Sequence, residues 1–239
     1  MSEALRLPLG RLDAPASGHI HVWMVRIPEF ELPGMAAPAG RRQRILETRI
    51  RQKFLLRLLL GAYLGRPGRD VRLAPGDNGK PRLAGGPDFN LSHSGDWLAV
   101  AVAAAGAGLV GIDVEQQRIL RRPRALAKRY FLPGEAAMLE GLEEPALSAA
   151  FLRLWTAKEA VIKAAGQTVA GHLSRVRLGH RNGLFLEELP DGWPDLAGWS
   201  LSELRQIPDL KAHLAVAGPV ESVTCRRLLP ALRQETLDT

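Results

Sequence analysis

The sequence is poor in cysteine and in aromatic side chains. It has one cysteine, Cys225, among 239 residues, and only 5% of the residues are phenylalanine, tryptophan or tyrosine. A single cysteine excludes an internal disulfide and a zinc site built from cysteines. The apolar, strand-like neighbourhood at residues 220–225 predicts that Cys225 is a small buried side chain.

Long apolar runs and a targeting signal are also missing. The longest uncharged run, residues 97–112, is shorter than the stretch of about 20 residues that spans a membrane, and glycines interrupt it. This run predicts a hairpin of two buried strands. The first residues have no basic segment followed by an apolar one, so we expect no secretion signal. The expected protein is cytoplasmic and has no membrane partner.

Several common catalytic motifs are absent. The sequence has no Walker A motif, no Gly-x-Gly-x-x-Gly after a strand, no His-Glu-x-x-His and no Gly-x-Ser-x-Gly. What it does have is 46% hydrophobic residues, enough for one large domain or two small ones, and a net charge of +7. The charge suggests an anionic partner such as nucleic acid, an acidic protein or a polyphosphate compound, although a biased coding composition would produce it too.

Acidic residues in two distant segments point to a metal site. Asp113 and Glu115 are two residues apart in a strand-like segment, so both side chains should lie on one side of the strand. Trp155, Glu159 and Lys163 follow each other at intervals of four, which places them on one face of a helix. Each segment alone also fits an ordinary solvated surface. Packed together, they would bring three carboxylates and a lysine to one Mg²⁺, which usually also binds phosphate oxygens.

Basic and hydroxyl residues upstream offer sites for an anion. The helical pattern over residues 41–64 begins with a run of arginines that is either a solvated face or a phosphate-binding edge. Residues 92–95, Ser-His-Ser-Gly, place hydroxyls, an imidazole and unhindered backbone amides at one spot, which suits an anionic ligand.

The predicted elements form two similar α+β halves. Long helices are expected at residues 41–64 and 145–165, and each half also has several short strands. We expect an N-terminal half at residues 1–110, a C-terminal half at 111–230 and a polar tail at 231–239. The site residues lie on both sides of this joint, as expected for a ligand bound between subdomains.

Four motifs in this order resemble the 4′-phosphopantetheinyl transferase family. They are Gly79-Lys80-Pro81, residues 89–94 (Phe-Asn-Leu-Ser-His-Ser), residues 111–115 (Gly-Ile-Asp-Val-Glu) and Trp155-Thr-Ala-Lys-Glu-Ala-Val-Ile-Lys163. The length is similar to that of the long, monomeric, Sfp-type branch. The resemblance implies two related halves about a pseudo-twofold, each with a long helix on a small, mostly antiparallel sheet. It also implies that coenzyme A and Mg²⁺ bind between the halves.

The resemblance also implies a role for each residue. The metal ligands would be Asp113, Glu115 and Glu159, with Glu159 and Lys163 as the catalytic residues. The residues on the phosphates of coenzyme A would be Lys80, Ser92, His93, Lys163 and either Arg42 or Arg44. The segment from Arg129 to Glu135 would serve packing. One departure is Leu58, where the family can have a small hydroxyl residue near the nucleotide.

The implied reaction transfers 4′-phosphopantetheine from coenzyme A to a serine of an acidic apo-acyl or peptidyl carrier protein, and releases adenosine 3′,5′-bisphosphate. Two other interpretations remain at this point. A Mg²⁺-dependent phosphoesterase would use the same carboxylates with water as the nucleophile. A basic nucleic-acid-binding module is suggested by charge alone, but the acids at the predicted site would repel a nucleic-acid backbone, so we expect no nucleic-acid partner.

Overall fold

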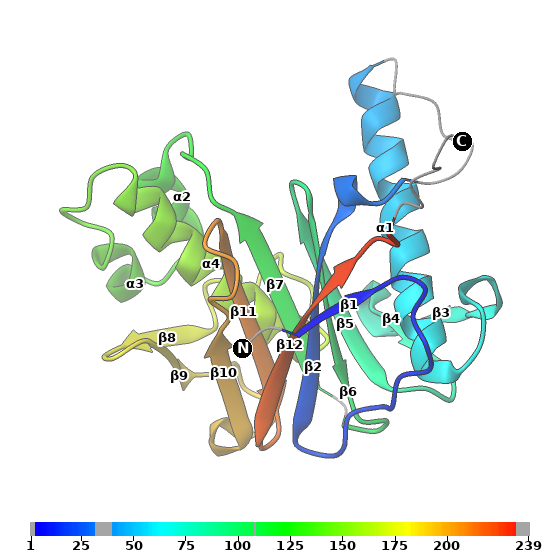
Figure 1. Ribbon diagram of the computed structural model, residues 1–239. Coiled ribbons are helices and arrows are strands. Elements are labelled where there is room, and N and C mark those ends of the chain that lie inside the picture. Colours follow the sequence, from blue (N-terminus) through cyan, green and yellow to red (C-terminus); the bar gives the residue numbers. More distant parts are fainter. Residues whose placement is uncertain (1–2, 32–39, 108, 233–239) are drawn as a thin grey trace.

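The computed structural model describes residues 3–31, 40–107 and 109–232, and shows two α+β lobes side by side (Figure 1). The first lobe contains β1 (Glu3–Arg6), β2 (His19–Arg26), η1 (Ile27–Glu29), α1 (Arg41–Leu64), η2 (Gly68–Asp70), β3 (Leu73–Pro75), η3 (Asp77–Gly79), β4 (Pro81–Leu83), β5 (Asp88–Ser94) and β6 (Trp97–Ala103). The second lobe contains β7 (Val110–Gln116), α2 (Pro123–Tyr130), α3 (Pro133–Ala137), α4 (Ala146–Ala164), β8 (Arg177–His180), β9 (Leu184–Glu188), η4 (Leu196–Gly198), β10 (Trp199–Glu203) and β11 (Leu210–Ala217). The last strand, β12 (Ser222–Leu229), returns to the first lobe.

The first lobe is a five-stranded sheet covered on one face by α1. Its strand order is β1-β12-β2-β6-β5, and β12 runs parallel to both of its neighbours while the other pairs are antiparallel. Leucines of α1 such as Leu55 and Leu59 are fully buried and pack with Trp23 and Val100 of the sheet. The helix ends where Gly65 takes a left-handed conformation, with φ of 63°. The sequence-based bounds of this helix, 41–64, are therefore confirmed.

The second lobe has a three-stranded antiparallel sheet, β10-β11-β7, with α4 packed on one face. The buried side of α4 contributes residues such as Leu154 and Val161 to this core. Trp155 packs edge-on against Tyr130, and its ring stacks 5.8 Å from that of Phe151. The α+β class and the mostly antiparallel sheets are thus as predicted, whereas the pseudo-twofold stays a prediction.

The inner faces of the two sheets pack against each other between the lobes. Ile20 and Ala101 of the first sheet share a core with Ile112 and Leu214 of the second. Residues 97–112 do form two buried strands, but the predicted hairpin is wrong. β6 and β7 belong to different sheets and meet face to face instead of side by side, because the connection between them crosses from one layer to the other.

The division of the chain at residues 110 and 111 stays a prediction, and β12 crosses it. This strand comes from the C-terminal half of the chain but lies between β1 and β2 in the sheet of the first lobe. In the described part of the chain, the helices all fall short of the length and apolar character needed to cross a membrane.

Gly111 lets β7 approach α4 closely. A Cβ atom built on Gly111 would lie 2.9 Å from Cα of Ala164 and still closer to the carbonyl oxygen of Ala160. Both neighbours are helix backbone, which cannot move away alone. The glycine that begins the Gly-Ile-Asp-Val-Glu motif is therefore required by packing.

Gly111→Ala is expected to destabilise the protein by about 1–3 kcal/mol, the usual cost of overpacking a core. Urea unfolding of the variant and of Gly134→Ala measures this, because a Cβ at Gly134 has no neighbour within 4 Å. Equal midpoints for Gly111→Ala and the parent protein would contradict the close packing.

Candidate active site

A cavity of about 670 Å³ lies between the lobes, where β5 and β7 are the facing edge strands of their sheets (Figure 1). The turn before β4, the strands β5 and β7, and the C-terminal half of α4 with the segment after it form its walls. Its lining includes the predicted site residues Lys80, Ser92, His93, Asp113, Glu115, Glu159 and Lys163.

Hydrogen bonds from side chains of β5, and not a ladder of backbone hydrogen bonds, join β5 to β7. The backbone N–H of Ile112 donates to Oδ1 of Asn90 at 2.8 Å. Two residues further along β5, Oγ of Ser92 donates to Oδ1 of Asp113 at 2.6 Å. Because residues i and i+2 of a strand point the same way, these bonds fix the two lobes at one register and hold the buried Asp113 carboxylate in place.

Ser94 continues this series; the sequence placed it in the Ser-His-Ser-Gly cluster but assigned it no role of its own. Its Oγ donates to Oε2 of Glu115 at 2.5 Å and accepts from the backbone N–H of Gln116 at 3.1 Å. Arg118 donates to the same Glu115 oxygen at 2.7 Å. The repeat of polar residues at 90, 92 and 94 was the sequence signal that could have revealed it.

Lys163 joins the acidic residues of β7 and α4. Its Nζ lies 2.5 Å from Oδ1 of Asp113, 3.3 Å from Oε2 of Glu159 and 3.2 Å from Oγ of Ser92. The predicted convergence of strand and helix is therefore present for these residues. Although burial lowers the pKa of Lys163, the charges of Asp113 and Glu159 outweigh this effect and raise it, so the ammonium stays charged.

Two carboxyl groups of this cluster, those of Asp113 and Glu159, resist ionisation. Burial is the main cause that raises the pKa of Asp113, which is 3% exposed. Burial and the charge of Asp113 raise the pKa of Glu159 to about 7. A buried carboxyl group with a pKa near neutrality is able to exchange a proton during a reaction.

The residues of the cluster fit a divalent cation in their chemistry, although other side chains now occupy their carboxylates. Oδ2 of Asp113 is buried and has no hydrogen-bond partner among the described residues, and three carboxylates line the cavity against the two ammonium groups of Lys80 and Lys163. Both features suit a hard cation with oxygen ligands. The described residues contain no preformed group of three metal-binding side chains, since Lys163 lies between Asp113 and Glu159 while Ser94 and Arg118 hold Glu115.

Lys80 connects the lobes at the C-terminal end of α4. Its Nζ donates to the carbonyl oxygen of Val110 at 2.8 Å and to that of Lys163 at 3.3 Å, and burial lowers its pKa to about 8. Asn78 donates to the carbonyl oxygen of Gly166 at 2.8 Å. Cations and donors at this end of a helix satisfy its last carbonyl groups. A phosphate contact of Lys80 stays a prediction.

The arginines of α1 do not line the cavity. Arg42 and Arg44 are exposed in the first turns and are not among the residues that line the cavity. Burial lowers the pKa of His93 most, and the positive charges of Lys163 and Arg49 lower it further. Arg49 is itself exposed and does not line the cavity. Sequence reasoning did not separate Arg49 from the rest of the arginine run, because its charge acts on His93 of a different element.

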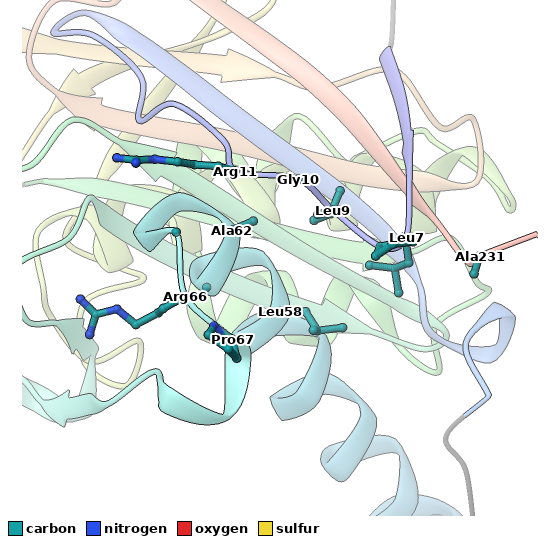
Figure 2. A pocket seen from close by; sticks show the side chains of 12 residues that line it. Leu7, Leu9, Gly10, Arg11, Leu58, Ala62, Arg66, Pro67 and Ala231 are labelled. Atoms are coloured by element: carbon teal, nitrogen blue, oxygen red, sulfur yellow. The ribbon is translucent and has the colours of Figure 1, made fainter.

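Leu58 is outside this site. It lines a second cavity of about 640 Å³ with Leu7, Leu9, Arg11 and Pro67, and the two cavities share no lining residue (Figure 2). The leucine that departs from the family pattern is therefore not in contact with the acid cluster.

His213 lies opposite Asp113 in the ladder of β11 and β7 and is 1% exposed. Burial lowers its pKa from 6.5 to about 4. The imidazole of His213 thus binds a proton less tightly in the folded protein than in the unfolded chain. Its contribution to the free energy of unfolding is therefore complete above pH 6.5 and is lost as the pH falls towards 4.

His213→Asn is expected to flatten the dependence of stability on pH. Between neutral and acid pH, the free energy of unfolding of the parent should fall by about 3 kcal/mol more than that of the variant, since each pKa unit corresponds to about 1.4 kcal/mol. Urea unfolding of both proteins across that interval provides the measurement. Parallel curves would show that His213 is not the titrating group.

The chain is similar to known proteins along most of its length. The family model described as the 4′-phosphopantetheinyl transferase superfamily matches residues 109–188, which include the acid cluster. The 4′-phosphopantetheinyl transferase HetI of a Nostoc species is 32% identical over 219 residues, which cover 84% of this chain and 89% of HetI. The 4′-phosphopantetheinyl transferase psf-1 of Bacillus pumilus is 34% identical over 186 residues, 74% of this chain and 76% of psf-1. The 4′-phosphopantetheinyl transferase Sfp of Bacillus subtilis is 34% identical over 126 residues, about half of each chain.

Proposed function

Since the chain belongs to the 4′-phosphopantetheinyl transferase superfamily, we propose that it moves 4′-phosphopantetheine from coenzyme A to a serine of an apo carrier protein in a Mg²⁺-dependent reaction. The products are the holo carrier and adenosine 3′,5′-bisphosphate. The observation that carries this proposal is the meeting of Asp113, Glu159 and Lys163 in a cavity with walls from both lobes.

Asp113, Glu115 and Glu159 would hold the Mg²⁺. When bound, this ion neutralises part of the negative charge on the pyrophosphate of coenzyme A. The support for it is the unpartnered Oδ2 of Asp113 and the excess of carboxylates over ammonium groups in the cleft. Lys163 contacts Asp113 and Glu159, so its ammonium would move towards the phosphates when a metal takes its place.

Glu159 would accept the proton of the attacking serine, directly or through a water molecule. Its pKa of about 7 leaves a large fraction as carboxylate at neutral pH while keeping it basic enough to remove a proton. The serine oxygen forms a bond to the phosphorus atom next to the pantetheine group, and the bond from that phosphorus to the bridging oxygen breaks. Lys163 would stabilise the negative charge that remains on the departing nucleotide.

His93, Ser92 and Lys80 would bind phosphate groups of coenzyme A, and Arg42 or Arg44 would bind the 3′-phosphate. For the 3′-phosphate, Arg49 is a third candidate because its charge reaches His93. Arginine forks match phosphate oxygens well. All of these groups lie in the first lobe or at the joint between the lobes.

The proposed partner is an acidic carrier protein, and the exposed side of α1 supports it. Leu46, Ile50 and Phe54 are 58%, 45% and 43% exposed and lie four residues apart along one helix face. Arg49 and Lys53 are exposed in the same stretch. An acidic surface with apolar side chains would complement this face, and attraction between the charges would weaken as salt rises.

We propose that the enzyme acts as a monomer.

The test is to mix the protein with coenzyme A, Mg²⁺ and a panel of apo carrier proteins and to follow the intact mass of each carrier. Addition of one phosphopantetheine group supports the proposal. Release of adenosine 3′,5′-bisphosphate without a carrier would show a phosphoesterase instead. A carrier KM that does not change with ionic strength would argue against the basic face of α1 as the docking surface.

A further inference from the structure

A buried ion pair lies behind the catalytic side of α4. Lys158 is 0% exposed and Glu135, on α3, is 1% exposed. Nζ of Lys158 donates to both carboxylate oxygens of Glu135, at 2.6 Å to Oε1, and to the carbonyl oxygen of Val176 at 2.5 Å. The three donor positions of the ammonium group are therefore directed to three acceptors.

The carboxylate of Glu135 is equally well satisfied. Its Oε1 accepts from the backbone N–H of Leu178 at 2.9 Å, and its Oε2 accepts from that of Leu132 at 3.0 Å. The pair thus ties α4 to the start of α3 and to β8. Each carboxylate oxygen accepts from a backbone N–H in addition to the lysine, so the carboxylate group cannot move without breaking several hydrogen bonds.

The pair is adjacent to the residues proposed for catalysis. Lys158 immediately precedes Glu159, and neighbouring residues of a helix are about 100° apart around its axis. The backbone of α4 is therefore held on one side by Lys158, while Glu159 on the next side faces Asp113 and Lys163. Thr156 gives a second anchor, because its Oγ1 is 2.8 Å from Nδ1 of His213.

We infer that Glu135 is a positioning residue: through Lys158 it sets the rotation of α4 about its axis and so places Glu159 for proton transfer. This inference rests on the proposed function. The pair touches none of the cavity-lining groups directly, so its effect on the reaction would pass through the helix backbone.

A contribution to stability alone does not explain this arrangement. The cost of removing two charges from water offsets much of their attraction, so a buried ion pair replaced by neutral residues of similar size often leaves stability unchanged or higher. What the pair provides, and a neutral replacement does not, is a set of directional bonds between α4 and two other elements. A positioning role and a purely stabilising role therefore predict different behaviour for a neutral double variant.

The test compares the parent with the double variant E135Q/K158M, the single variant E135D and the control E188Q. E135Q/K158M removes both charges and retains an oxygen acceptor for one of the two backbone N–H groups, those of Leu178 and Leu132, that bind the carboxylate. E135D keeps the charge but shortens the side chain by one methylene group. E188Q removes an exposed ion pair with Arg177 on the β8–β9 hairpin. Melting curves define the temperature below which each protein is fully folded, and all kinetics are measured there.

At that temperature E135Q/K158M and E135D should have kcat about 10- to 100-fold below the parent with the KM for coenzyme A within about threefold, because small misplacements of a catalytic group cost this much. E188Q should behave as the parent does. A folded double variant or a folded E135D with the parent's kcat would overturn the inference. A raised KM for coenzyme A with an unchanged kcat would overturn it too. A parent protein that modifies no carrier would refute the proposed function itself, which the comparison among variants cannot do.

Discussion

Glu159→Gln should lower kcat by about two to three orders of magnitude, which corresponds to about 3–4 kcal/mol of transition-state stabilisation. The carboxyl group has a pKa of about 7, is 3.3 Å from Nζ of Lys163, and is proposed both as base and as metal ligand. Glutamine has a similar shape but cannot accept the serine proton. We therefore expect the loss in kcat to exceed any change in the KM for coenzyme A, measured by intact mass of the carrier over time.

The matched control is Glu187→Gln, an exposed glutamate on β9 that is distant from the cavity lining. It removes the same charge and should keep the parent's kcat. Near-native turnover of Glu159→Gln at saturating Mg²⁺ would show that Glu159 is neither the base nor a ligand. The acid cluster would then need another role.

Asp113→Asn is expected to raise the Mg²⁺ concentration needed for half-maximal activity by at least about tenfold, since changes around a metal site commonly cost 10- to 100-fold in affinity. Asp113 has one oxygen held by Ser92 and Lys163, and the other is buried without a partner. Asparagine keeps the volume and removes the charge. Calorimetric titration of the protein with Mg²⁺ gives the same quantity without turnover.

Carrier affinity should change less than the Mg²⁺ requirement in Asp113→Asn, because Asp113 is 3% exposed and cannot form part of a docking surface. Glu187→Gln serves again as the control for loss of one negative charge. An unchanged Mg²⁺ titration with a raised carrier KM is the pattern that would refute ligation by Asp113.

Sequence reasoning was most successful where the signal is local and periodic. The interval of four between Glu159 and Lys163 and the interval of two between Asp113 and Glu115 depend only on helix and strand geometry, and both pairs line the cavity. The helix at 41–64 has its predicted bounds because Gly65 ends it. In such cases the residues that decide the structure are neighbours in the chain.

Sequence reasoning failed where the residue or strand that determines a feature is distant in the chain. The sequence around β6 and β7 does not indicate that the two strands belong to different sheets. A hairpin also contains an apolar strand, a segment with glycines and a second apolar strand. Lys158 and Glu135 are 23 residues apart, and their burial against each other could not be read from a motif in which lysine and glutamate usually face solvent. The role of Ser94 was missed for the same reason, because its Oγ bonds to Glu115, on a strand of the other lobe.

The place of β12 has a consequence for how the polypeptide is made. A fragment that ends at residue 110 would leave β1 without a neighbour and β2 without one of its two, since both pair with β12. The first lobe therefore cannot close its sheet while the C-terminal strand is still inside the ribosome. Synthesis from the N-terminus therefore does not deliver two independent units in turn, because β12 follows the whole second lobe in the chain.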